Sequence, residues 1–122
     1  MELLGDQEHL RWLQPLAYQP QLELLLTADC PHWPQAYRTF ADALSARGRG
    51  DQDIALTVIR DEAQAQTRRF PGSPTFLVDG VDPFASPDAT AGLACRRYDT
   101  PDGRRATPSL DQLTAALTFT LV

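Results

Sequence analysis

The sequence contains no lysine: all eleven of its Lys/Arg side chains are arginine. Without lysine, the chain can use neither Schiff-base chemistry nor a lysine general base. The formal net charge at pH 7 is −5, so the chain lacks the overall positive field that would hold nucleic acid or an anionic membrane surface. We therefore expect neither a nucleic-acid partner nor a membrane partner.

Cysteine and long apolar runs are also scarce. Two cysteines are too few for a disulfide scaffold in a chain of 122 residues. The N-terminal stretch from Met1 to Asp6 is acidic and has no apolar run long enough for a secretory signal or a membrane span. These absences predict a cytoplasmic protein in a reducing environment, and the length predicts one domain.

Residues 1–20 are predicted to form a helical appendage, and residues 21–122 the domain itself. Pro15 and Pro20 break regular structure between the two. The appendage either packs on the surface of its own domain or serves as a partner arm that forms a homodimer, since its leucines and Trp12 add apolar area at a terminus.

Apolar runs typical of strands alternate with amphipathic stretches typical of helices. Strands are expected at 22–26, 53–60, 75–79 and 93–98, and helices at 33–44, 61–69 and 109–117. A helix that joins the first two strands through short connections implies a parallel, right-handed βαβ unit. The loop at 80–92 is long for a hairpin connection, which allows a functional role, although Asp82-Pro83-Phe84 within it indicates a solvated turn.

Cys30 stands where the first apolar run gives way to the first amphipathic helix. Unpaired backbone N–H groups and the positive end of the helix dipole favour the thiolate there, which is the reactive form of the side chain. Cys30 is thus either a functional thiol or an inert residue. His32 either supports the thiol by stabilising its charge or shuttling a proton, or has no role. Trp33 is expected to pack under the turn, with contact to a substrate as the alternative.

The element order β-α-β-α-β-β-α, with Cys30 at the first strand-to-helix turn and Pro74 before the third strand, resembles the thioredoxin and glutaredoxin superfamily over roughly Gln21 to Leu117. The resemblance implies an α/β fold. The fold would be a thioredoxin-like sandwich with a mixed four-stranded sheet in order 2-1-3-4, flanked by helices and with an N-terminal helix added. It also implies that Pro74 is cis and faces Cys30, and that Ser73, next to Thr75 in the substrate-binding segment, presents backbone groups to an extended thiol substrate.

Several short motifs make a closer resemblance, to small thioredoxin-like proteins of uncharacterised role. The motifs are Cys-Pro-x-Trp at 30–33, Gly-Ser-Pro-Thr at 72–75, Val-Asp-Gly at 78–80, Asp-Pro-Phe at 82–84 and Leu-x-Cys-Arg-x-Tyr at 93–98. Some members of this group are grouped by name with alkylmercury lyases.

The chain departs from the dithiol pattern, because Trp33 stands where a resolving cysteine would be. Three possibilities remain: exchange through Cys30 with an external thiol, resolution by Cys95, or loss of the redox role. If the last two strands pair regularly, Cys95 lies opposite about Val78, roughly 10 Å along the sheet from its active end. Disulfide formation needs Cα atoms within about 7 Å. The expected register therefore disfavours a Cys30–Cys95 bond and indicates a buried, apolar role for Cys95.

Metal binding has weak support in the sequence. Cys30, His32, Cys95 and His9 lack the paired spacing of structural zinc sites, so no metal site and no cofactor are expected. A soft metal such as mercury needs fewer ligands, but organomercurial cleavage would need both thiols and an acid, such as Asp29, close together. The arginine doublets at 68–69, 96–97 and 104–105 are expected to pair with carboxylates at the surface.

The sequence thus predicts a cytoplasmic thiol-redox protein with Cys30 as its nucleophile. Its substrate would be a protein or small-molecule thiol or disulfide, framed by Ser73 and Pro74. Two alternatives stay open: a non-catalytic thioredoxin-like module for binding or dimerisation, and soft-metal or organomercurial handling through Cys30 with Cys95.

Overall fold

The computed structural model describes residues 21–117. The predicted N-terminal appendage and its dimerisation arm, at residues 1–20, lie outside the described residues, as do residues 118–122.

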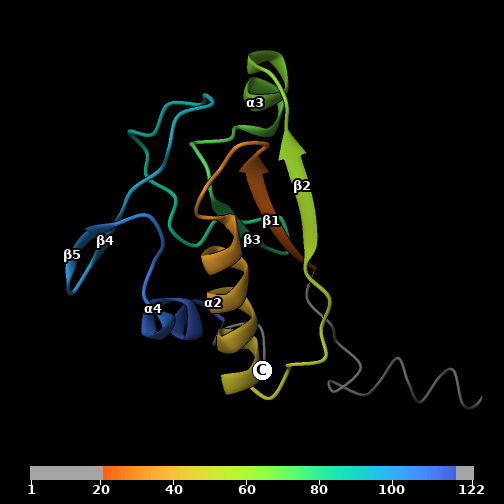
Figure 1. Cartoon of the computed structure of the whole chain (residues 1–122), viewed down its shortest axis with the longest axis vertical. Coiled ribbons are helices and arrows are strands. Elements are labelled where there is room, and N and C mark those ends of the chain that lie inside the picture. Colours follow the sequence, from red (N-terminus) through yellow and green to blue (C-terminus); the bar gives the residue numbers. More distant parts are fainter. Residues whose placement is uncertain (1–20, 118–122) are drawn as a thin grey trace, which may run out of the picture.

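A three-stranded sheet forms the centre of the fold. Its strands are β1 (Leu22–Thr27), β2 (Ala55–Ile59) and β3 (Thr75–Val78), in the order β2-β1-β3. β1 runs parallel to β2 and antiparallel to β3, and Figure 1 shows β1 between its two neighbours. The parallel βαβ unit and the order of the first three strands are confirmed.

The predicted fourth strand at 93–98 is wrong, and a four-stranded sheet in order 2-1-3-4 is not found within residues 21–117. A separate two-stranded sheet forms instead from β4 (Tyr98–Thr100) and β5 (Gly103–Arg105). Apart from one isolated bridge, between Ser73 and Cys95, residues 93–97 are irregular. The bridge to Ser73 is the one strand-like pairing of these residues, and Ser73 lies before β3. Residues 93–97 therefore do not pair along β3.

Three helices complete the described fold: α2 (Trp33–Ala46), α3 (Glu62–Arg68) and α4 (Leu110–Ala116). Asp61 caps α3 by accepting a hydrogen bond from the Gln64 N–H at 2.8 Å. Ser109 and Gln112 form the predicted capping box of α4. These helices begin where the sequence predicts because each cap requires only neighbouring residues.

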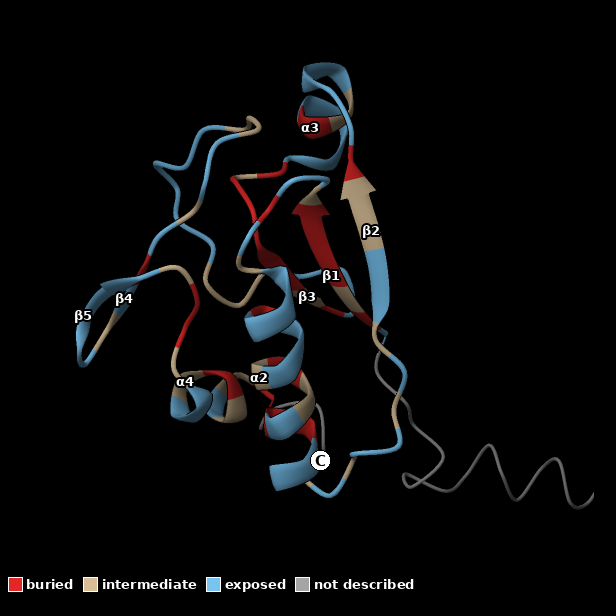
Figure 2. Cartoon of the chain, in the orientation of Figure 1, coloured by how far each residue is buried: buried red, intermediate tan, exposed pale blue. Residues whose placement is uncertain are grey.

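The sheet carries an apolar cluster on each face, which explains why β1 is almost entirely apolar. Leu24 and its alternate neighbours pack with Phe40 of α2 and Leu113 of α4 in the larger cluster. Leu25 packs with Ala65 of α3 in the smaller one. Figure 2 shows β1 as the most continuously buried strand. Its C-terminal end, where Cys30 follows, is therefore fixed by packing from both sides.

No helix among residues 21–117 is both long enough and apolar enough to cross a lipid bilayer.

Candidate functional site

The Cys30 turn connects the buried end of β1 to α2, as predicted. The Cys30 N–H donates to the Thr27 carbonyl at 3.2 Å, which closes the turn directly after the strand. His32 is the N-cap residue of α2, and its side chain makes no capping hydrogen bond. The thiol thus precedes the first turn of a 14-residue helix, and the dipole of that helix favours a negative charge near its N-terminus.

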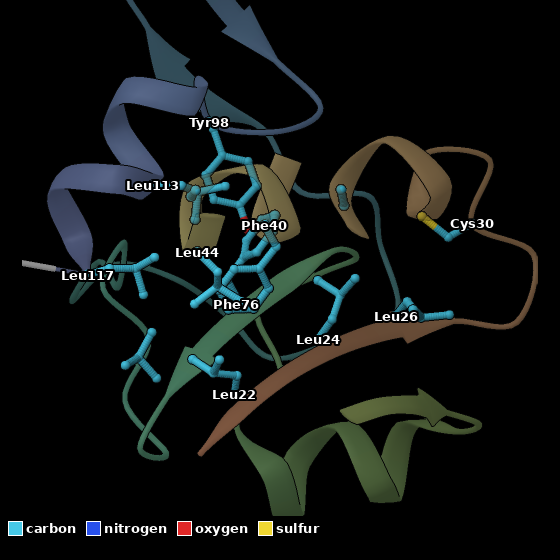
Figure 3. Close-up of a cluster of buried hydrophobic side chains, with 13 residues drawn as sticks. Leu22, Leu24, Leu26, Cys30, Phe40, Leu44, Phe76, Tyr98, Leu113 and Leu117 are labelled. Atoms are coloured by element: carbon cyan, nitrogen blue, oxygen red, sulfur yellow. The ribbon is translucent and has the colours of Figure 1, made fainter. Parts of the chain in front are cut away.

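The Cys30 side chain is only 6% exposed and belongs to the larger apolar cluster, together with Leu26 and Ala36. Figure 3 shows it at one end of that cluster. The expectation that Trp33 packs under the turn is wrong, since Trp33 is 39% exposed. The buried stripe of α2 starts at Ala36, and Trp33 points to solvent together with Tyr37 one turn further along.

The second part of the site is the segment Ser73-Pro74-Thr75, which is buried throughout. The Ser73–Pro74 peptide bond is cis, the geometry that the resemblance implies at this position. Continuing the antiparallel register beyond Leu25 and Thr75 brings Ser73 beside Thr27. The Ser73 Oγ accepts a hydrogen bond from the Thr27 N–H at 3.1 Å. This bond joins the cis-proline segment to the turn that carries Cys30.

The 94–96 segment covers the other side of Ser73. The Ser73 N–H donates to the Ala94 carbonyl at 3.0 Å, and the Ser73 carbonyl accepts from the Arg96 N–H at 2.9 Å. In this conformation both backbone groups of Ser73, which the resemblance assigns to an extended substrate, are bonded to the chain itself. The contact is close: a Cβ at Gly72 would lie 2.9 Å from the Ala94 carbonyl oxygen, so only glycine fits there.

The predicted position of Cys95 is therefore wrong. Cys95 forms an isolated β-bridge with Ser73, at the end of the sheet where the Cys30 turn lies, whereas the sequence placed it opposite Val78. It is also exposed, whereas the sequence indicated a buried role. A regular antiparallel pairing would have carried Cys95 down the strand. Instead, the chain after the 80–92 loop returns directly to Ser73.

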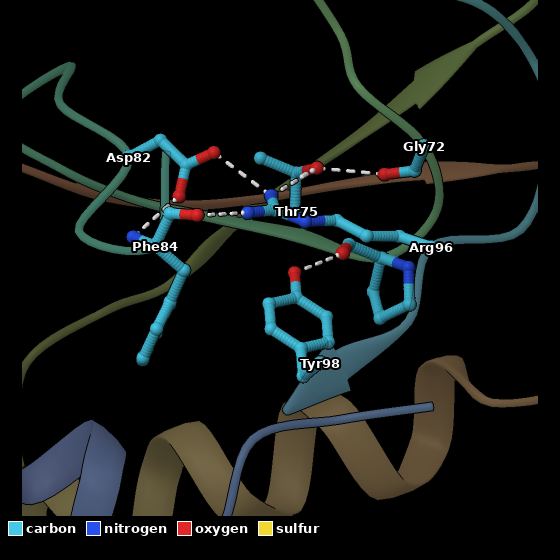
Figure 4. Close-up of polar contacts among 7 residues, drawn as sticks. Gly72, Thr75, Asp82, Phe84, Arg96 and Tyr98 are labelled. Carbon is cyan, nitrogen blue, oxygen red and sulfur yellow. Dashed lines mark hydrogen bonds and ion pairs between the residues drawn. The ribbon is translucent and has the colours of Figure 1, made fainter. Parts of the chain in front are cut away.

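Arg96 fixes the 94–96 segment through a polar network that the sequence reasoning missed. Its guanidinium donates to the Asp82 carboxylate at 2.8 Å, to the Phe84 carbonyl at 2.6 Å and to the Thr75 hydroxyl at 3.2 Å, as Figure 4 shows. The Arg96 and Asp82 side chains are only 10% and 14% exposed. Both the surface role expected for Arg96 and the solvated turn expected around Asp82 are wrong.

Thr75 and Tyr98 complete the support behind the cis-proline. The Thr75 hydroxyl donates to the Gly72 carbonyl at 2.6 Å while accepting from Arg96. The Tyr98 hydroxyl donates to the Pro74 carbonyl. Burial raises the pKa of Tyr98 well above its usual value, so this side chain stays a neutral hydrogen-bond donor. Thr75 is 1% exposed and supports the segment from behind.

In each of the two other doublets, one arginine pairs with a carboxylate at the surface, as expected. Arg68 pairs with Glu23 at 2.9 Å and Arg104 with Asp99 at 3.3 Å, both with solvent access. The Asp-Pro-Phe motif supplies Asp82 and Phe84, two of the three hydrogen-bond partners of Arg96, but no pattern in the sequence shows that this motif and Arg96 meet.

Two hollows flank the Cys30 turn. One, of about 320 Å³, is lined by the turn residues Thr27 and Asp29 together with Arg60 and Leu93. The other, of about 430 Å³, includes His32, Arg97 and Arg105 in its lining. Cys30 itself is not among the residues that line either hollow. Within residues 21–117, no three potential ligands from His, Cys, Asp and Glu side chains gather as a metal-binding group.

Comparison with protein-family models, with curated proteins and with solved structures finds no match to this chain.

Proposed function

We propose that the protein is a thioredoxin-like thiol–disulfide exchange protein in which Cys30 is the nucleophile. In this proposal the fold is a variant of the thioredoxin-like sandwich in which the 94–96 segment, bonded to Ser73, lies where a fourth strand would pair. The sheet order β2-β1-β3 and the covering of both sheet faces support it. We place the exchange in a reducing cytoplasm, since two cysteines are too few for the disulfide framework typical of small secreted domains.

One observation carries the proposal. The hydrogen bond from the Thr27 N–H to the Ser73 Oγ ties the cis-proline segment to the Cys30 turn. Because of it, a thiol at the start of a helix and a buried cis-proline segment occupy the same end of the sheet. A thiol in that place lies directly before the first turn of α2 and beside the segment that would frame a substrate.

The chemistry is a thiol–disulfide exchange with a protein or small-molecule disulfide as substrate. The Cys30 thiolate attacks one sulfur of the substrate, the S–S bond breaks, and one half leaves as a thiolate while the other stays on Cys30 as a mixed disulfide. His32, two residues on, supplies or accepts a proton at the turn. The exposed ring of Trp33 gives the bound half an apolar contact.

The test uses a peptide carrying a glutathione mixed disulfide as substrate, with reduced glutathione as the external thiol. We expect Cys30→Ser to lower turnover to the rate of glutathione alone, because a hydroxyl cannot replace the thiolate. Cys30→Ala, which keeps the buried site apolar, should do the same and so separates loss of chemistry from loss of folding. If either folded variant keeps the full rate, Cys30 is not the nucleophile.

A second candidate is a non-catalytic thioredoxin-like binding module. Two observations favour it: the Cys30 thiol is almost entirely buried, and both backbone groups of Ser73 are already bonded within the chain. It predicts that the wild-type protein itself gives no rate above glutathione alone in the same assay. A rate well above that background excludes this candidate.

A further inference from the structure

We propose that Cys95 is the resolving thiol of Cys30, so that the chain cycles between a dithiol and an intramolecular Cys30–Cys95 disulfide. This inference rests on the proposed function, because it requires Cys30 to take up a substrate sulfur. It adds a second reacting residue outside the turn, and it removes the need for an external thiol in the step that releases the product.

The first support is that Ser73 is bonded to both segments that carry the cysteines. On one side, Ser73 accepts a hydrogen bond from Thr27, whose carbonyl in turn accepts from the Cys30 N–H. On the other side, Ser73 bonds to Ala94 and Arg96, the residues that flank Cys95. Cys30 and Cys95 are the chain's only cysteines, and one residue separates the two segments that carry them.

The second support is the way in which Cys95 is held. Arg96 anchors the segment through its nearly buried ion pair with Asp82 and its bond to the Phe84 carbonyl. The Cys95 side chain itself is exposed. Its backbone is therefore fixed beside Ser73 while its thiol stays accessible, which is the arrangement that a resolving thiol needs.

The distance between the Cα atoms of Cys30 and Cys95 depends on the turn from Thr27 to Cys30. Neighbouring strands lie about 4.8 Å apart, so the Cα of Cys95 lies roughly 10 Å from that of Thr27, with Ser73 between them. The turn from Thr27 to Cys30 keeps its two ends within about 7 Å, and a disulfide needs Cα atoms within about 7 Å. Ala28 and Asp29 inside the turn are exposed. A rearrangement of these two residues that draws the Cys30 side chain out of the edge of the apolar cluster brings it toward Cys95.

The step balances as a two-electron reduction of the substrate. After Cys30 has formed its mixed disulfide, the Cys95 thiolate attacks the Cys30 sulfur. The bond between Cys30 and the substrate breaks, and the second substrate half leaves as a thiolate that takes up the proton lost by Cys95. The substrate disulfide becomes two thiols, and the two protein thiols become one disulfide. An external dithiol then reduces the Cys30–Cys95 bond for the next cycle.

The experiment treats the reduced full-length protein with one equivalent of glutathione disulfide, stops the reaction with acid and alkylates the remaining thiols. We expect wild type to end with no alkylated cysteine and no bound glutathione. Because the chain lacks lysine, trypsin cuts only after arginine, and the disulfide should link the peptide Trp12–Arg38 to the peptide Phe70–Arg96.

Cys95→Ser is the matched variant, since it changes one atom at an exposed position. It should hold glutathione on Cys30 and release it at least about tenfold more slowly than wild type, because an intramolecular thiol acts at a high effective concentration. If wild type keeps glutathione on Cys30 while Cys95 is alkylated, or links only between chains, Cys95 does not resolve Cys30 and the inference fails.

The two proposals fail in different ways in this experiment. If Cys30 of the Cys95→Ser variant takes up no glutathione, the proposed function fails and the inference fails with it. If Cys30 takes up glutathione equally in both proteins and releases it at the same rate, the proposed function stands and only the role of Cys95 is overturned.

Discussion

At the scale of single residues, Arg96 decides the shape of the site. Its side chain satisfies Asp82, the Phe84 carbonyl and the Thr75 hydroxyl, and its guanidinium carbon lies 4.5 Å from the centre of the Tyr98 ring. A nearly buried ion pair offsets its own desolvation cost only while both charges are present. Arg96 therefore holds the 94–96 segment against Ser73, and Cys95 with it.

We predict that Arg96→Met lowers the free energy of unfolding by about 3 kcal/mol, because it leaves the Asp82 carboxylate nearly buried without a counter-charge. Urea denaturation followed by circular dichroism measures the loss. The control is Arg97→Met at the exposed neighbouring position, which should change the stability by less than about 0.5 kcal/mol. Equal effects of the two substitutions would contradict the structural role of Arg96.

At the scale of elements, the site consists of two connecting segments, the Cys30 turn and the 94–96 segment, whose thiols differ in exposure to solvent. The Cys30 turn packs its thiol into the apolar cluster, whereas the 94–96 segment leaves the Cys95 thiol in solvent. Exposure limits how fast a small reagent reaches a thiol, so the two cysteines should differ in alkylation rate although both of their segments are bonded to Ser73.

We predict that iodoacetamide alkylates Cys95 at least about tenfold faster than Cys30 in the native protein, since Cys30 becomes accessible only when the turn opens locally. Mass spectrometry of the Cys30→Ala and Cys95→Ala variants gives the two rates separately. Both thiols should react at similar rates in denaturant. A native Cys30 that reacts as fast as Cys95 would show that the turn does not shield its thiol.

The elements also show what sequence patterns can predict. The βαβ unit, the Asp61 cap and the Ser109–Gln112 capping box depend on residues near one another in the chain, and all three are found. The run at 93–98 has the composition of a strand, but its position is set by Ser73 and Asp82, far away in the sequence. The spacing of apolar residues within 93–98 contains no information about those contacts. The placement of Cys95 and the buried role of Arg96 could therefore not be predicted.

Trp33 illustrates the same limit on one helix. A large apolar side chain in a first turn favours burial, yet the rotation of α2 is set by the stripe of Ala36, Phe40, Ala43 and Leu44. That stripe meets the sheet and α4. Trp33 is seven residues before Phe40, so the helical period places it on the same face as the stripe. Its exposure follows from its place as the first residue of α2, before the buried stretch begins at Ala36, and no local pattern shows where along the helix that stretch begins.

At the scale of the whole molecule, the proposed disulfide would join the two halves of the chain. Cys30 follows β1, and Cys95 lies beyond β2, α3 and β3, so the bond would close a loop that contains most of the sheet. Closing a loop removes conformations from the unfolded chain more than from the folded one. The redox state of the site should therefore be visible in the stability of the entire fold.

We predict that the oxidised wild-type protein unfolds with a free energy about 4 kcal/mol larger than that of the reduced protein, the value expected for a loop of this length from chain entropy. Urea titrations with and without a dithiol reductant measure the difference. Cys95→Ser should show the same midpoint in both conditions, because it cannot close the loop. If oxidation leaves the wild-type midpoint unchanged while both thiols are lost, the cysteines have paired between chains, and the loop that links the turn to the 94–96 segment does not form.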